Sequence, residues 1–161
     1  MSDYKISWTD THDVQETKTV PAYDNTNIAP RCVIGLDRDG VINIEGFEPI
    51  EGSLHAITKL RYLGHKIVII TNQGGILKGL FTSDDVEAVH SHMFDLLAQA
   101  GCPTIDALFY SESSLRSDPY AKPNTGMFKR CENEIKHIKF KQGYYVGDKI
   151  SDLKAAFKMG A

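Results

Sequence analysis

Two aspartates one residue apart, Asp37 and Asp39, are the residues of this sequence best suited to phosphoryl chemistry with a divalent cation. They follow an apolar run that starts at Val33 and they precede Gly40, a pattern typical of a buried strand that ends in a turn. Asp37 can present its carboxylate to a hard cation and to phosphorus, whereas Asp39 can offer its backbone carbonyl to the cation and its carboxyl to a leaving group. The tetrapeptide alone is equally typical of a plain turn, so the rest of the chain must decide.

Two later apolar segments are also followed by polar residues that could bind phosphate. Thr71, Asn72 and Gln73 come before two glycines, and their hydroxyl, amide and nearby backbone N–H groups suit a phosphate held without formal charge. Lys122 stands before Pro123 at the predicted start of a helix, where an ammonium can pair with phosphate oxygens. Each of these two signals is weak by itself.

The last apolar segment is followed by two further acids, Asp148 and Asp152, with Lys149 between them. Asp152 alone would also be an ordinary acid at the N-terminus of a helix. The carboxyl ends of parallel strands are where ligands bind in open α/β sheets. Four successive strand ends that all carry such groups therefore indicate a functional site.

Strands and helices alternate from residue 31 onward. This βα repeat favours parallel strands with right-handed crossovers, a Rossmann-like sheet in an α/β fold. We expect Ser53 to cap the first helix and Thr82 or Ser83 to cap the second. The expected strands end near 37 and span 66–70, 105–110 and 143–146; the expected helices begin near 53, 83, 125 and 151 and end near 63, 100, 137 and 160.

Length and composition fit one soluble domain. The chain has 161 residues, of which 42% are hydrophobic and 24% charged, and a net charge of −3 gives no general electrostatic footprint for nucleic acid. The three cysteines are far apart and lack the spacing of metal ligands, so we expect reduced thiols and a cytoplasmic location. No apolar run is long enough to cross a bilayer. Residues 1–30 are polar and without sustained period, and we read them as an N-terminal arm ahead of a domain at 31–161.

The motifs DRDGVIN, TNQGG, KP and GDKISD, in this order, resemble the four motifs of the haloacid dehalogenase superfamily of phosphohydrolases. The resemblance covers residues 31–161 and is greatest to subfamily IIIA, the branch that holds heptose bisphosphate phosphatase and histidinol phosphatase. The polynucleotide 3′-phosphatases belong to the same branch, and residues 122–128 resemble their third motif. The resemblance implies a three-layer α/β/α fold and a Mg²⁺-dependent phosphomonoesterase.

The family's roles can be carried over to matching positions of this chain. Asp37 would be the nucleophile that forms an aspartyl-phosphate, and Asp39 would protonate the leaving alcohol and later deprotonate water. The Asp37 carboxylate, the Asp39 carbonyl and Asp148 would hold Mg²⁺, with Asp152 steadying one of its waters. The residues that would hold the phosphoryl group or line the substrate site are Thr71, Asn72, Gln73, Lys122 and Lys149.

The chain departs from this family pattern in the loop before Lys122. The bacterial sugar phosphatases commonly carry Cys and His ligands for a structural zinc there, and an Arg directly precedes the Lys. Residues 111–121 contain neither Cys nor His, so we predict no zinc, and Ala121 stands where the Arg would be. The missing guanidinium weakens the case for the same bisphosphate substrate, and Arg116 is a candidate substitute within the loop.

Neither usual insertion point for a cap domain is filled, so the site should be open to a bulky substrate or else covered by a second subunit. Relatives continue into another strand beyond the position of Ala161, so we expect a truncated sheet edge or one completed by a partner. His90 and His92 are two apart on a predicted helix and diverge, which argues against a shared metal.

The sequence favours a phosphatase for a sugar phosphate or related small metabolite, with no membrane partner. A polynucleotide 3′-phosphatase is the alternative, and only that alternative involves nucleic acid. Two alternatives of another class are a response-regulator receiver and a non-catalytic phosphate-binding protein. A receiver's Lys-Pro follows its final strand, whereas here another strand and Asp148 come after Pro123, and the presence of both Asp37 and Asp39 argues against a binding protein.

Overall fold

A four-stranded parallel sheet carries the predicted site residues at one edge. The computed structural model describes residues 31–44 and 48–161. The strand order is β5-β4-β1-β6, so β1 lies in the middle, with Gly35 in register with Val68 of β4 and with Tyr145 of β6. Because all these strands run parallel, the segments that follow β4, β1 and β6 emerge side by side. The strand bounds are β1 (Val33–Leu36), β4 (Lys66–Asn72), β5 (Ala107–Ser111) and β6 (Tyr144–Val146).

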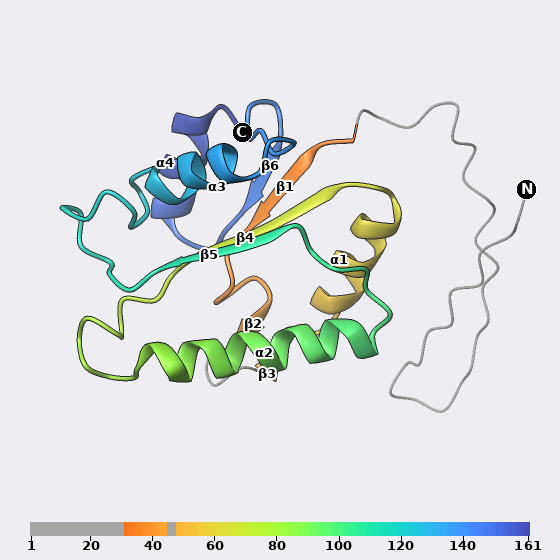
Figure 1. Ribbon diagram of the computed structural model, residues 1–161, viewed down its shortest axis with the longest axis horizontal. Helices are drawn as coiled ribbons and strands as arrows, with labels where there is room; N and C mark the ends of the chain where they lie inside the picture. The colour runs from red at the N-terminus through yellow and green to blue at the C-terminus, as the bar shows by residue number, and fades with distance from the viewer. Residues whose placement is uncertain (1–30, 45–47) are drawn as a thin grey trace, which may run out of the picture. The chain divides into compact units, whose positions relative to one another are not determined.

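Helices cover both faces of this sheet, which makes the fold the predicted three-layer α/β/α type (Figure 1). Helices α1 (Ser53–Tyr62) and α2 (Ser83–Gln99) lie on one face, and α3 (Gly126–Glu134) and α4 (Ile150–Met159) on the other. Alternate residues of the buried strands serve the two faces, as the pleat requires. Ile67 and Ile69 belong to the core under α1 and α2, whereas Val68 and Ile70 belong to the core under α3 and α4.

The segments at which a cap domain would be inserted are short. Between β1 and α1 the described residues form only a two-stranded antiparallel sheet, β2 (Asn43–Ile44) with β3 (Glu48–Pro49). Between β4 and β5 the chain forms only α2 and its connections. In the described ranges, no helix combines the length and the apolar character that a membrane span needs. The predicted N-terminal arm, residues 1–30, lies outside the described residues.

Two helix-start predictions had different outcomes. Thr82 caps α2 as expected, because its hydroxyl accepts from the Asp85 backbone N at 3.2 Å and the Asp85 carboxylate accepts from the Thr82 backbone N at 2.7 Å. The expected cap at Ser53 was wrong. Gly52, with φ 79°, is the N-cap of α1, and the Ser53 hydroxyl donates instead to the Ile42 carbonyl at 2.8 Å.

Long-range contacts also moved two expected boundaries. Strand β5 begins at Ala107 rather than at Ile105, because the Asp106 carboxylate accepts from the Ile67 backbone N at 2.8 Å and pairs with Arg61 at 2.7 Å. Helix α3 ends at Glu134, short of the expected residue 137. Its continuation is drawn into the core through Ile138 and Phe140, both fully buried, so the chain must leave the helical path.

Candidate active site

Asp37 stands where β1 ends, at the centre of the sheet edge. Its backbone N donates to the Val146 carbonyl of β6 at 2.9 Å, which fixes the chain as it leaves the strand. Its carboxylate Oδ1 accepts from the Arg38 backbone N at 2.8 Å and lies 3.0 Å from Lys122 Nζ. Burial raises the pKa of Asp37, the charge of Lys122 opposes this, and the charge of Asp152 adds to it, so the pKa ends above its usual value.

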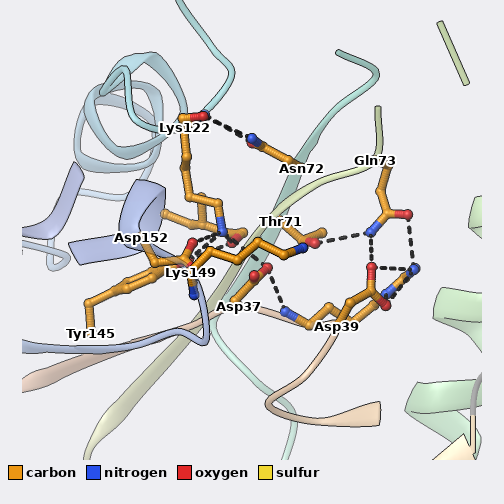
Figure 2. Close-up of polar contacts among 11 residues, drawn as sticks. Asp37, Asp39, Thr71, Asn72, Gln73, Lys122, Tyr145, Lys149 and Asp152 are labelled. Atoms are coloured by element: carbon orange, nitrogen blue, oxygen red, sulfur yellow. Dashed lines mark hydrogen bonds and ion pairs between the residues drawn. The ribbon is translucent and has the colours of Figure 1, made fainter. Parts of the chain in front are cut away.

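Lys122 connects the buried acids of the site (Figure 2). Its side chain is only 1% exposed, and Nζ lies 3.0 Å from Asp37 Oδ1 and 2.6 Å from Asp152 Oδ1. Nζ also donates to the Ile70 carbonyl at 2.8 Å and to the Tyr145 hydroxyl at 2.9 Å. A lysine this deeply buried must be paired. Its charge therefore holds two carboxylates together that would otherwise repel each other.

Two neighbours hold Lys122 in this position. The Asn72 side chain bridges to the Lys122 backbone, because its Oδ1 accepts from the Lys122 N at 2.9 Å and its Nδ2 donates to the Lys122 carbonyl at 3.0 Å. Tyr145 of β6 donates its hydroxyl proton to the Ile70 carbonyl at 2.6 Å. Burial and the charges of Asp37 and Asp152 raise the pKa of Tyr145, so the phenol stays protonated. Tyr145 was missed at the sequence level, where a tyrosine within a strand carries no signal of this role.

Asp39 is held by three side chains. Arg38 donates through Nε to Asp39 Oδ1 at 3.1 Å and through Nη2 to the same oxygen at 3.0 Å. Gln73 Nε2 donates to Asp39 Oδ2 at 2.9 Å, and Asn43 Nδ2 donates to Oδ1 at 3.1 Å. Burial alone would raise the pKa of Asp39, but the charge of Arg38 and these hydrogen bonds outweigh it and lower the pKa. Asp39 is therefore a carboxylate near neutral pH.

Gln73 links this group to Thr71. Its Nε2 donates to Thr71 Oγ1 at 3.0 Å, and its Oε1 accepts from Arg38 Nη2 at 2.9 Å. The oxygen and nitrogen of the Gln73 amide thus orient Arg38 and Asp39 through hydrogen bonds. Arg38 was not among the predicted site residues, although a charged residue between two candidate acids after a buried strand was a usable signal.

Three carboxylates gather at one point of the site. One oxygen from each of Asp37, Asp148 and Asp152 lies within 4.8 Å of the others. Asp152 is fully buried and its Oδ2 accepts from the Lys149 backbone N at 3.0 Å, whereas Asp148 is exposed. Gly40, with φ 79°, passes so close that a side chain there would collide with the Asp148 carboxylate.

This donor set fits Mg²⁺. The donors are hard carboxylate oxygens, which Mg²⁺ prefers. Three carboxylates against the single ammonium of Lys122 leave two negative charges uncompensated, the charge that one divalent cation neutralises. When bound, the ion would draw charge from the phosphoryl oxygens and let an anionic carboxylate approach them.

A cavity of about 390 Å³ opens onto these groups. Asp37, Asp39, Lys122 and Asp152 line it, together with Asn72, Lys149 and residues of the loop after β5 and of α4. Thr71 and Gln73 are buried behind this surface and do not line the cavity. Their predicted contacts with the phosphoryl group stay predictions.

His90 lies behind the Asp39 group and not in the cavity. Its ring packs edge-on against Tyr110 with centroids 5.4 Å apart, and neither ring nitrogen has a hydrogen-bond partner among the residues that the structure describes. Burial and then the charge of Arg38 lower the pKa of His90 to about 4. It is a neutral core residue at pH 7, and residues 37, 148 and 152 form the acidic cluster without it.

Comparison with known proteins agrees with this geometry. The model of the family described as "Polynucleotide kinase 3 phosphatase" matches residues 47–159. Two D-glycero-beta-D-manno-heptose-1,7-bisphosphate 7-phosphatases are similar to the chain. The protein of Escherichia coli O6:H1 is 34% identical over 76% of this chain and 72% of its own length, and that of Pseudomonas putida is 33% identical over 78% and 77%.

Solved structures agree as well. The D,D-heptose 1,7-bisphosphate phosphatase of B. bronchiseptica, complexed with magnesium and phosphate, aligns with a TM-score of 0.73 at 32% identity, over 80% of this chain and 76% of that one. A putative HAD-like phosphatase of Mesorhizobium loti aligns with a TM-score of 0.70 at 28% identity, over 81% and 69%.

Fold and site together define a phosphatase of the haloacid dehalogenase type, as the four motifs had indicated. Within that class, the chain belongs to the polynucleotide kinase 3 phosphatase family, and its curated relatives include the heptose bisphosphate phosphatases.

Proposed function

We propose that this chain is a Mg²⁺-dependent phosphomonoesterase that works through an aspartyl-phosphate on Asp37, with a sugar phosphate or bisphosphate as its substrate. The observation that carries the proposal is the pairing of a buried, lysine-bound nucleophile with an acid two residues later that has its own set of hydrogen bonds. Asp37 and Asp39 therefore lie in different environments, which suits one carboxylate to the role of nucleophile and the other to that of acid and base.

The first step transfers the phosphoryl group to the protein. An Asp37 oxygen attacks phosphorus, the bond from phosphorus to the leaving oxygen breaks, and the leaving oxygen takes a proton that the Asp39 carboxylate has first accepted from solvent. Asp39 lines the cavity with 39% of its side chain exposed, so it can exchange a proton with solvent and with a leaving alcohol. The Lys122 ammonium counters charge on the transferring oxygens.

The second step regenerates Asp37. Water attacks phosphorus while Asp39 takes its proton, and the bond between phosphorus and the Asp37 oxygen breaks. Because Arg38 and Gln73 keep Asp39 ionised when no leaving group is present, Asp39 is ready as the base for this step. Mg²⁺ would be held by Asp37, Asp148 and Asp152, with the Asp39 carbonyl as a further ligand implied by the family.

The small-molecule substrate is favoured by the curated relatives, whose names specify a heptose bisphosphate. The description of the matching family favours the second candidate, a polynucleotide 3′-phosphatase. Phosphate release should be measured with sugar mono- and bisphosphates beside a 3′-phosphorylated oligonucleotide, with Mg²⁺ and with chelator. Faster release from a sugar phosphate supports the first candidate, and faster release from the oligonucleotide supports the second.

A further inference from the structure

The Lys122 ammonium has more oxygens around it than protons to donate. Four oxygens lie close to Nζ, namely one of Asp37 at 3.0 Å, one of Asp152 at 2.6 Å, the Ile70 carbonyl at 2.8 Å and the Tyr145 hydroxyl at 2.9 Å. An ammonium has three N–H groups. A phosphoryl group on Asp37 brings further oxygens to this set. Lys122 can therefore donate to the phosphoryl group only if it withdraws an N–H from one of its present acceptors.

The Ile70 carbonyl is the acceptor from which Lys122 can withdraw. The pairing of β1 with β4 ends at Leu36 and Ile69, so this carbonyl lies beyond the residues paired between these two strands. It accepts from Lys122 Nζ, and it also accepts from the Tyr145 hydroxyl at 2.6 Å. A buried carbonyl that loses its donor is unfavourable. Because the phenol is a second donor, the carbonyl keeps a hydrogen bond when the lysine turns away.

A glycine in the middle of the sheet makes room for Tyr145. Tyr145 of β6 is in register with Gly35 of β1, and a Cβ at position 35 would collide with the Tyr145 ring. Since β1 lies between β6 and β4, the tyrosine crosses β1 at this glycine to reach the carbonyl on β4. The ring also packs against Phe128, with centroids 5.2 Å apart. Glycine weakens a strand interior and often marks a close approach, and here the approaching group is this ring.

We propose that Tyr145 is a positioning residue for phosphoryl transfer, whose hydroxyl keeps the Ile70 carbonyl hydrogen-bonded and so frees a Lys122 N–H for the transferring oxygens. This inference rests on the proposed function, because it takes the reacting phosphoryl group to lie at Asp37. The exchange redirects the N–H that now points to the carbonyl, so Lys122 keeps its ion pairs with Asp37 and Asp152. Tyr145 acts through the lysine and does not itself touch the substrate.

The test compares Tyr145→Phe with Tyr144→Phe. The first variant removes only the hydroxyl and keeps the ring that packs against Phe128. The second makes the same change at the neighbouring tyrosine, which is exposed. Hydrolysis of p-nitrophenyl phosphate in excess Mg²⁺ gives kcat and KM. Two inhibitors separate binding from transfer, because inorganic phosphate stays tetrahedral whereas vanadate takes the five-coordinate geometry of a phosphoryl group in transfer.

In Tyr145→Phe, Lys122 is the one of these two donors that is left to the Ile70 carbonyl, so its withdrawal removes both. We expect kcat and kcat/KM to fall together by about tenfold or more, with KM unchanged, as for an interaction made only during transfer. The inhibition constant of vanadate should rise by a similar factor, and that of inorganic phosphate should stay unchanged. Tyr144→Phe should match the wild-type protein in all four quantities.

The wild-type protein gives a second readout that needs no variant. With ¹³C-labelled tyrosine, the Cζ resonance reports the hydrogen bonds at each phenol oxygen. Vanadate in the presence of Mg²⁺ should shift the Tyr145 resonance, because Lys122 changes its hydrogen bonds beside that oxygen. The resonance of Tyr144, which is exposed, should not move.

Three results would overturn this role of Tyr145. They are a kcat of Tyr145→Phe equal to that of Tyr144→Phe, equal losses of affinity for phosphate and vanadate in Tyr145→Phe, and a Tyr145 resonance that vanadate does not move. Equal losses would mean that the hydroxyl only keeps the site in shape. Failure of the proposed function looks different, because the wild-type protein would then release no p-nitrophenol in Mg²⁺ at all.

Discussion

Replacement of Lys122 by methionine tests the electrostatic core of the site. The change keeps an unbranched side chain of similar length but removes the charge that lies 3.0 Å from Asp37 and 2.6 Å from Asp152. Both carboxylates then stay buried without a cation, and the Ile70 carbonyl loses one donor. Breaking a buried pair in this way typically costs about 3–5 kcal/mol of the free energy of unfolding. For a domain of this size, that loss lowers Tm by roughly 10–15 °C.

The pH dependence of this loss separates charge from packing. Burial already raises the pKa of Asp37 above its value in the unfolded chain, and without the opposing charge of Lys122 this pKa rises further. The folded variant then binds more protons than the unfolded chain, so its stability increases as the pH falls. The deficit against wild type should therefore be largest at pH 7 and shrink toward pH 4.

Urea unfolding at pH 7, 5.5 and 4 measures this deficit. Lys158→Met is the control, because Lys158 is exposed and, among the residues that the structure describes, its Nζ donates only to the Pro123 carbonyl, at 2.9 Å. That variant should stay within about 0.5 kcal/mol of wild type. A Lys122→Met protein as stable as the control at pH 7, or one whose deficit grows on acidification, would refute the reasoning.

Three further predictions concern the surroundings of Asp37. Gln73→Leu removes a donor to Asp39 and should raise the pKa of Asp39 by up to about one unit; a carboxyl titration followed by ¹³C NMR that finds no change contradicts this. The pKa of His90 is about 4 in the folded protein, below the unfolded value of 6.5, so the unfolded chain binds more protons and the free energy of unfolding decreases as the pH falls. From pH 7 to 5, wild type should lose up to about 2 kcal/mol more stability than His90→Leu, as measured by urea unfolding. Asp148→Asn should raise the Mg²⁺ concentration for half-maximal activity by about tenfold or more, and unchanged Mg²⁺ dependence would remove Asp148 from the metal site.

The gathering of the site residues could be predicted because parallel strands end at one edge of a sheet. Asp37, Lys122 and the pair Asp148 and Asp152 are far apart in the chain, yet each follows a strand, and the sheet order brings them together. The apolar runs of β1 and β4 had the length and the β-branched residues that indicate buried strands. The apolar pattern of the strands and the parallel topology of the sheet were therefore sufficient to predict that these residues lie together.

The roles of single polar groups were harder to predict, because they depend on contacts between distant residues. Lys122 was predicted to bind the phosphoryl group, but its contacts with Tyr145 and the Ile70 carbonyl, both far away in sequence, were not predicted. Gln73 was predicted to lie in the substrate site, and its hydrogen bonds to Asp39 and Thr71 are a further role that the sequence alone did not indicate. Ser53 has the right residue type for a helix cap, and only the position of Ile42 diverts its hydroxyl.

The phosphoryl group on Asp37 is the most direct test of the account. The protein is mixed with substrate and Mg²⁺, quenched in acid within one turnover, and digested, and the peptide that contains Asp37 is analysed by mass spectrometry. We predict a phosphorylated Asp37 that is absent with chelator and absent in Asp37→Asn, which should also lose Mg²⁺-dependent phosphate release. Undiminished phosphate release by Asp37→Asn, or turnover with no phosphate ever on Asp37, would contradict the account.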